Sequence, residues 1–113
     1  MFKLTPRSHG WAETLLYNFR GSSGQRAINS GVVFDTAGNL YGATYPENAC
    51  CSLIYQLTPG KGRWKYRTVH RFTGSQQGGK PSGNLILGTQ GNLYGTAAIG
   101  GAHGSGVVFE VTP

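Results

Sequence analysis

The sequence predicts an all-β protein built from two copies of a four-stranded antiparallel unit. The pentapeptide GNLYG occurs at Gly38–Gly42 and again at Gly91–Gly95, which are 53 residues apart. The apolar runs are short, rich in β-branched and aromatic residues, and show no 3.6-residue helical period. Nineteen glycines and five prolines supply turn residues between these runs. A repeated turn motif with short apolar runs indicates a repeated β-sheet unit.

The same offset relates other landmarks along the chain. Because several landmarks keep one register, we interpret the chain as a single repeat domain over residues 1–113. Its first repeat covers about 2–59 and its second about 60–113. The last Thr-Pro pair follows one residue later than the offset predicts, at Thr112-Pro113. The matching pairs are Trp11 with Trp64, Leu4-Thr-Pro6 with Leu57-Thr-Pro59, and Arg20-Gly-Ser with Thr73-Gly-Ser.

The first two strands of each unit form a predicted hairpin. In the first copy the strands cover residues 31–35 and 40–44, and Thr36-Ala-Gly-Asn forms the turn between them. We expect Gly38 and Gly91 to adopt a positive φ, which Asn39 and Asn92 also tolerate. Asp35 is expected to cap the turn through its side chain.

Two further strands complete the predicted unit. Residues 52–57 form the third strand, which Pro59 ends because proline donates no backbone hydrogen bond. Residues 63–72 form a long fourth strand of alternating basic and aromatic residues. Four strands in about 50 residues is the size of a β-propeller blade. The nearly continuous apolar character of the first two strands predicts sheets covered on both faces.

The chain carries a net charge of +6, and five basic residues follow the predicted fourth strand. Lys61, Arg63, Lys65, Arg67 and Arg71 form a cationic stripe that could bind a polyanion such as nucleic acid. The other interpretation is a solvated outer strand whose charges prevent edge-to-edge aggregation. The first copy has uncharged residues at these places, so we favour the second interpretation and expect no nucleic acid partner.

The sequence favours binding over catalysis, because it contains only four carboxylates: Glu13, Asp35, Glu47 and Glu110. The spacing of these residues suggests no catalytic pair, and the three histidines fall at unrelated repeat positions. We therefore expect no metal site and no cofactor. The segment Gly74–Lys80 matches the start of a phosphate-binding loop, but Pro81 replaces the required Ser or Thr. It is interpreted as a loop between strands.

Cys50 and Cys51 are neighbours, and a bridge between them would be strained because adjacent Cα atoms lie only about 3.8 Å apart. Free thiols or a bond to another chain are the alternatives. Most aromatic residues, including Trp11, Trp64, Tyr41 and Tyr94, are interpreted as core between sheets. Tyr45 is the more exposed choice for a ligand, and the ligand-binding candidates as a set are Tyr45, Arg63, Lys65, Arg67, Arg71 and Lys80.

The segments FKLTP, ETLLYNF and GVVFDTAGNLYGAT together resemble the GloVer (Gloeo/Verruco) tandem repeat of bacterial surface proteins. The resemblance covers nearly the whole chain in two copies. It implies blades of a β-propeller and an extracellular or cell-surface parent protein, and it implies no catalytic residues. Relatives often carry two separated cysteines in the loop before the third strand, whereas Cys50 and Cys51 are adjacent here.

Closed propellers contain about 4–8 blades, so two blades need partners. We expect either a homo-oligomer, in which three or four chains close a ring, or flanking repeats of a longer chain. The N-terminal residues MFKLTPRSHG contain no signal-peptide core, and no apolar run is long enough to span a membrane. The predicted function is a scaffold or recognition module, with polysaccharide as the possible ligand. The alternatives are a carbohydrate-active enzyme fragment with its site across blades and a polyanion binder.

Overall fold

The computed structural model describes residues 1–19, 25–27, 31–46, 52–74 and 76–113. Over these residues the chain forms ten β-strands and no helix, so the all-β prediction is confirmed. The strands are β1 (Phe2–Arg7), β2 (Gly10–Leu15), β3 (Gln25–Ala27), β4 (Val33–Phe34), β5 (Leu40–Pro46), β6 (Leu53–Thr58), β7 (Lys65–Arg71), β8 (Pro81–Leu87), β9 (Leu93–Ala97) and β10 (Val107–Val111).

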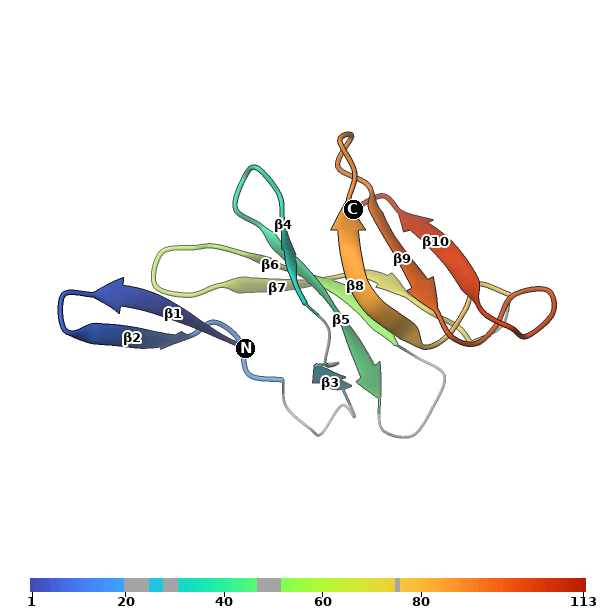
Figure 1. Ribbon diagram of the computed structural model, residues 1–113, viewed down its shortest axis with the longest axis horizontal. Coiled ribbons are helices and arrows are strands. Elements are labelled where there is room, and N and C mark those ends of the chain that lie inside the picture. The colour runs from blue at the N-terminus through green and yellow to red at the C-terminus, as the bar shows by residue number, and fades with distance from the viewer. Residues whose placement is uncertain (20–24, 28–30, 47–51, 75) are drawn as a thin grey trace.

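The strands form three antiparallel sheets that follow one another along the molecule (Figure 1). A hairpin of β1 and β2 stands at one end, a five-stranded sheet of β3 to β7 in the middle, and a three-stranded sheet of β8, β9 and β10 at the other end. Within the middle sheet, β3 and β4 both pair with β5. Together they take the place that β8 alone takes beside β9. The middle sheet crosses the division between the two repeats that the sequence places at residues 59 and 60.

Strand register confirms the internal repeat residue by residue. The pairings among β4, β5 and β6 recur 53 residues later among β8, β9 and β10, with the offset rising to 54 for β10 because one residue is added before it. The β3–β5 pairing is the exception, because it lies one residue away from the register that β8 keeps with β9. Strands β1 and β2 therefore correspond to the third and fourth strands of a unit, as β6 and β7 do. The matching pairs are Phe2↔Leu15 with Tyr55↔Thr68, Val33↔Tyr41 with Ile86↔Tyr94, and Gly42↔Tyr55 with Gly95↔Phe109.

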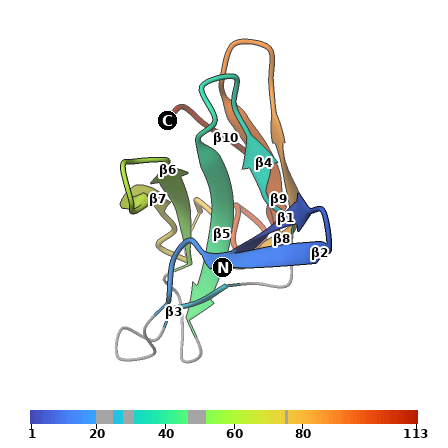
Figure 2. The ribbon, with the colours of Figure 1, turned by 90° about the vertical axis from the view of Figure 1, so that its left-hand side faces the viewer.

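The two GNLYG turns have the predicted geometry and point to the same end of their sheets (Figures 1 and 2). Gly38 and Gly91 both have φ = 84°, a conformation that favours glycine. In the first turn the Asp35 carboxylate accepts hydrogen bonds from the backbone N–H groups of Ala37 and Asn39, at 3.0 and 2.8 Å. The predicted cap is therefore confirmed, and it fixes the turn that leads into β5.

Two apolar clusters cover opposite faces of the middle sheet. The first lies between the middle and three-stranded sheets and contains Tyr41, Ile54, Phe72, Leu85, Leu93 and Val111. The second lies between the middle sheet and the N-terminal segment and contains Leu16, Leu40, Leu53, Tyr55 and Leu57. Figure 2 shows the β1–β2 hairpin in front of the middle sheet. The prediction of sheets covered on both faces is thus correct for the middle sheet.

That prediction is wrong for the three-stranded sheet, because no described segment packs on its outer face. Ile86 is 66% exposed and Val108 is 81% exposed there. The assignment of Tyr94 and Trp11 to a core is wrong for the same reason. Tyr94 lies on this outer face and is 37% exposed, while Trp11 lies on the β1–β2 hairpin and is 68% exposed. Their counterparts Tyr41 and Trp64 are buried and half-buried, respectively.

The chain is extended for its length. Its radius of gyration is 15.1 Å, whereas a compact domain of this size would have about 13 Å. The principal extents are 54 × 35 × 23 Å, with the three sheets arranged along the longest axis (Figure 1). Large apolar side chains are exposed at both ends of this row: Phe2, Leu4, Trp11 and Leu15 on the hairpin, and Ile86, Tyr94 and Val108 on the three-stranded sheet.

Candidate functional site

The junctions between neighbouring sheets are the most regular chemical feature of the molecule, and one aromatic contact occurs at both. At the first junction the rings of Phe19 and Tyr55 meet edge to face, with centroids 5.1 Å apart and planes at 64°. At the second, Phe72 and Phe109 meet at 5.0 Å and 66°. Phe72 and Phe109 are the repeat counterparts of Phe19 and Tyr55. Edge-to-face pairs of this kind add about 0.5–1.5 kcal/mol beyond area burial.

Residues around this contact also recur from one junction to the other. Met1 and Leu16 pack on Leu40 and Leu57 at the first junction. Their counterparts Ile54 and Val69 pack on Leu93 and Val111 at the second. In addition, Gly31 N–H donates to Asn84 Oδ1 at 2.7 Å, which links equivalent positions of the first strands of two neighbouring sheets. The sheets therefore stack through a repeated set of contacts.

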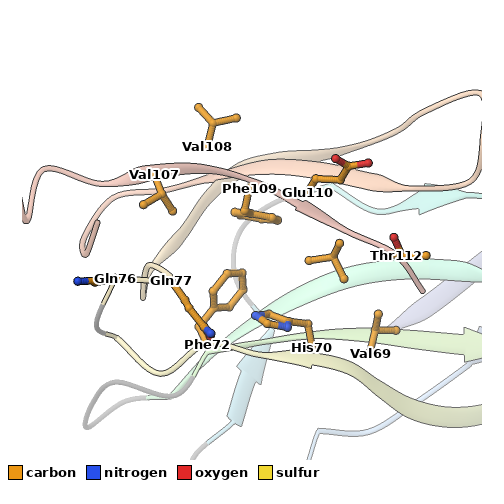
Figure 3. A pocket seen from close by; sticks show the side chains of 11 residues that line it. Val69, His70, Phe72, Gln76, Gln77, Val107, Val108, Phe109, Glu110 and Thr112 are labelled. Carbon is orange, nitrogen blue, oxygen red and sulfur yellow. The ribbon is translucent and has the colours of Figure 1, made fainter. Parts of the chain in front are cut away.

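The ring of Tyr66 packs against three aromatic rings at the first junction. It stacks on Tyr17, with centroids 4.7 Å apart and planes at 16°, and on Tyr55 at 5.9 Å and 21°. Phe19 meets the same ring edge to face at 6.3 Å. The counterparts of these three neighbours are His70, Phe72 and Phe109. At the second junction they line an open groove of about 500 Å³ beside β10 (Figure 3).

A carboxylate holds the Asn and Tyr of GNLYG in each unit, but it comes from different strands. In the first unit Asp35 Oδ2 accepts from Asn39 Nδ2 at 2.8 Å and from the Tyr41 hydroxyl at 3.0 Å. Burial raises the pKa of Asp35, but the hydrogen bonds from Asn39, Tyr41 and Ala37 outweigh it and hold the pKa below its usual value. Burial and the bond to Asp35 raise the pKa of Tyr41.

In the second unit the residue at the place of Asp35 is Gly88, which has no side chain. Glu110 on β10 accepts instead from Asn92 Nδ2 and from the Tyr94 hydroxyl, the latter at 2.9 Å. This bond to Glu110 raises the pKa of Tyr94. The counterpart of Glu110 in the first unit is Gln56, which donates to Tyr41 at 2.8 Å and accepts from Arg67 Nε at 2.9 Å. Each unit thus anchors its turn to a neighbouring strand.

The structure brings some of the six ligand-binding candidates together, but only in pairs. Lys80 Nζ lies 5.2 Å from the centroid of the Tyr45 ring, within the range of a cation–π contact. Arg63 and Lys65 line a second groove of about 840 Å³ beside Tyr17 and Tyr66. Arg67 is held by Gln56, and Arg71 is exposed at the end of β7. The candidates therefore lie on several surfaces.

The basic strand β7 forms an edge of the middle sheet, and Lys65, Arg67 and Arg71 on it are exposed. A bulge between its pairings with Ile54 and Tyr55 interrupts the predicted alternation near Val69. The segment that resembles a phosphate-binding loop leads into β8, which begins at Pro81, so it lacks the helix that such a loop requires. The second observation agrees with the interpretation of residues 74–80 as a loop between strands, while the role of the basic stripe stays a prediction.

Cys50 and Cys51 lie outside the described residues. Over the described part of the chain, no three His, Cys, Asp or Glu side chains gather as metal ligands would. The described residues also include no apolar helix long enough to cross a membrane.

Sequence reasoning missed the last glycine of each GNLYG motif. Gly42 pairs directly with Tyr55, and Gly95 with Phe109. A Cβ atom at either glycine would lie under 3.0 Å from the opposing ring. These glycines therefore make room for the aromatic side chains of the inter-sheet contact. Their recurrence opposite an aromatic residue was the available signal, but it requires the strand pairing to be known.

Comparison with known families gives one match, the Gloeobacter/Verrucomicrobia repeat, which covers residues 1–113. Comparisons with curated proteins and with solved structures give no match. The family assignment agrees with the repeated registers and with the repeated inter-sheet contacts. The chain therefore belongs to the Gloeobacter/Verrucomicrobia repeat family.

Proposed function

We propose that the chain is a non-enzymatic scaffold module whose sheets stack as successive blades of a β-propeller. The observation that carries this proposal is the aromatic contact made by Phe19 with Tyr55 and again by Phe72 with Phe109. A contact that recurs at every junction lets further units be added without a new interface. Repeat proteins gain their stability from such nearest-neighbour contacts.

The exposed outer face of the three-stranded sheet supports the same proposal. Ile86, Tyr94 and Val108 are exposed there, whereas their counterparts Val33, Tyr41 and Ile54 contribute to the core between sheets. A further unit stacked on this face would bury it in the same way. That unit comes from flanking repeats of a longer chain or from further copies that close a ring. Family membership supports an extracellular or cell-surface location.

Duplication of one unit tests the scaffold function. Residues 38–90 are inserted a second time after Gln90, so that the peptide join reads GTQGNLYG as in the parent and each position of the added unit keeps a residue of its repeat equivalent. We expect the longer chain to unfold in one transition at a higher temperature than the parent, because one inter-sheet junction is added. A separate transition for the inserted unit, or an unchanged midpoint, would contradict stacking through a repeated interface.

The mass in solution distinguishes the two sources of further units. Light scattering of the isolated chain should give three or four times 12.0 kDa if copies close a ring. A mass of 12.0 kDa assigns completion to flanking repeats. In either case the duplicated unit should still stack, so the two experiments answer different questions.

The second candidate function is recognition of polysaccharide, and the contact between Lys80 and Tyr45 favours it. An aromatic ring that stacks on sugars beside a cationic group suits an acidic polysaccharide. Binding of heparin and of uncharged dextran to the chain would be compared by calorimetry. We expect heparin binding that weakens in both Tyr45→Ala and Lys80→Ala variants, with no binding of dextran. Unchanged heparin binding by both variants would reject this site.

A further inference from the structure

Strand β10 pairs with β9 in the way that β6 pairs with β5, but β6 has a second partner strand and β10 has none among the described residues. The register of β9 with β10 repeats that of β5 with β6. β6 also pairs along its other edge with β7, whereas no described strand pairs with the other edge of β10. The backbone groups along this edge are therefore placed to receive an extended segment by strand addition.

The groove beside this edge is the open counterpart of the site that holds Tyr66. Tyr17, Phe19 and Tyr55 surround the Tyr66 ring at the first junction. Their counterparts His70, Phe72 and Phe109 line the groove along β10, together with residues of β10 itself (Figure 3). Among the described residues, no other aromatic ring lines or fills the groove. Its volume of about 500 Å³ is ample for an aromatic side chain.

The charge of Glu110 on β10 indicates which kind of residue should follow the aromatic one in a bound segment. In the β6–β7 pairing, Tyr66 lies opposite Leu57, and Arg67 lies opposite Gln56 and donates to it. The counterparts on β10 are Val111 and Glu110. A segment in the same register would place its aromatic residue opposite Val111 and the following residue opposite Glu110. The carboxylate of Glu110 favours a basic side chain at that place.

We propose that the β10 edge and this groove bind an extended segment, not part of residues 1–113, that carries an aromatic residue followed by a basic one. This inference rests on the proposed stacking function and names the strand chemistry that the three-stranded sheet accepts. Strand β2 of a second copy fits poorly. It would place Glu13, the counterpart of Tyr66, in the aromatic position and next to Glu110. Strand β7 of a second copy is already paired within its own sheet.

The probe is a labelled peptide with the sequence of residues 63–72, which contains the aromatic–basic pair Tyr66-Arg67. Its binding to the intact chain is measured by fluorescence anisotropy at about 150 mM salt. The peptide and the chain are both positively charged, so long-range attraction does not drive binding. We expect saturable binding. Replacing the peptide tyrosine by alanine should weaken it about fivefold to tenfold, as expected for loss of aromatic contacts.

A charge exchange tests the register. A peptide with Arg67→Glu should bind the parent chain several-fold more weakly and should bind a Glu110→Lys chain better than the parent peptide does. Circular dichroism confirms that the Glu110→Lys chain is folded. A His70→Ala chain should also bind the tyrosine peptide more weakly, whereas its binding of the alanine peptide should change little. The backbone N–H resonances that shift should be those of residues 107–112.

The inference would be overturned by no binding at millimolar peptide, by equal binding of the tyrosine and alanine peptides, or by resonance shifts centred on the β1–β2 hairpin. A stable dimer that the peptide does not dissociate would assign the groove to a second copy and would also overturn it. The duplicated-unit chain can fold even if the peptide fails to bind. Failure of this inference is therefore distinguishable from failure of the proposed function.

Discussion

The two junctions of the molecule are made by equivalent residues, yet they differ in completeness. At the first junction Tyr66 fills the space between Tyr17, Phe19 and Tyr55. At the second, His70, Phe72 and Phe109 make the corresponding space, which opens as a groove (Figure 3). The aromatic contact between sheets has the same geometry at both. The repeated sequence thus determines the contact, while the neighbouring strands determine how far it is enclosed.

The GNLYG tyrosines show the same distinction. Tyr41 is 4% exposed and Tyr94 is 37% exposed, although both lie at equivalent register positions. Each tyrosine bonds to a carboxylate, but Asp35 precedes its turn, whereas Glu110 lies on the adjacent strand. Anchoring of the turn is therefore retained even when the acidic residue changes place. If burial sets the contribution of equivalent residues, substituting the more buried one should lower the free energy of unfolding more.

The largest difference is expected between Phe72→Ala and Phe19→Ala. Phe72 is 1% exposed, and removing its ring should lower the free energy of unfolding by about 3–5 kcal/mol. Phe19 is half-buried, so its removal should cost clearly less. Urea unfolding of both variants measures the difference. Leucine at each position serves as the milder control if the Phe72→Ala chain does not fold. A larger loss for Phe19 would contradict the comparison.

The glycines opposite the aromatic rings should behave alike in the two units. Gly42→Ala and Gly95→Ala each place a methyl group against the ring of Tyr55 or Phe109. Overpacking of this kind costs about 1–3 kcal/mol. Combining Gly95→Ala with Phe109→Leu should recover part of the loss, because the smaller side chain leaves room. Additive losses in this double variant, measured by thermal unfolding, would show that the ring is not responsible.

Removal of the tyrosine hydroxyls should separate the two turns. Tyr41→Phe removes the hydroxyl that bonds half-exposed Asp35 and buried Gln56, which should cost about 1–1.5 kcal/mol. Tyr94→Phe should change stability less, because Glu110 and Asn92 remain accessible to water. Equal losses in urea unfolding would mean that burial does not distinguish the two networks.

The smallest effect concerns the charge of Asp35. Its native pKa is lowered, so its ionised form stabilises the fold above its unfolded pKa, and this contribution disappears as the pH falls through the native pKa. Between pH 5 and about 2, Asp35→Asn should therefore lose less stability than the parent chain. Thermal midpoints across this range provide the measurement. Parallel curves for the two chains would show that Asp35 does not contribute.

Much of this architecture could be predicted from the sequence because it depends on local patterns. GNLYG predicted the hairpin turn through Gly38 and Gly91, and the 53-residue offset predicted the equivalence of the units. Strands β5 and β6 lie close to their predicted ranges. The burial of a side chain could not be predicted from its position in the repeat alone. Tyr41 and Tyr94 occupy the same place in their units, but the presence of a neighbouring sheet determines which is buried.

The inter-sheet site was less accessible to sequence reasoning. Phe19 with Tyr55 and Phe72 with Phe109 come from strands that are distant in sequence, and their contact depends on how the sheets pack. The explanation of Gly42 and Gly95 required knowing which aromatic residue lies opposite. The basic residues of β7 were predicted as possible ligand-binding residues. Arg67, however, donates a hydrogen bond to Gln56, and this bond depends on the β6–β7 register.

The central claim is that one aromatic contact joins the sheets at both junctions. Nuclear Overhauser measurements on a deuterated chain with protonated Phe and Tyr rings test it directly. We expect cross-peaks between Phe19 and Tyr55 and between Phe72 and Phe109, with similar intensities because the centroid distances are 5.1 and 5.0 Å. Cross-peaks at one junction without the other would contradict a repeated interface.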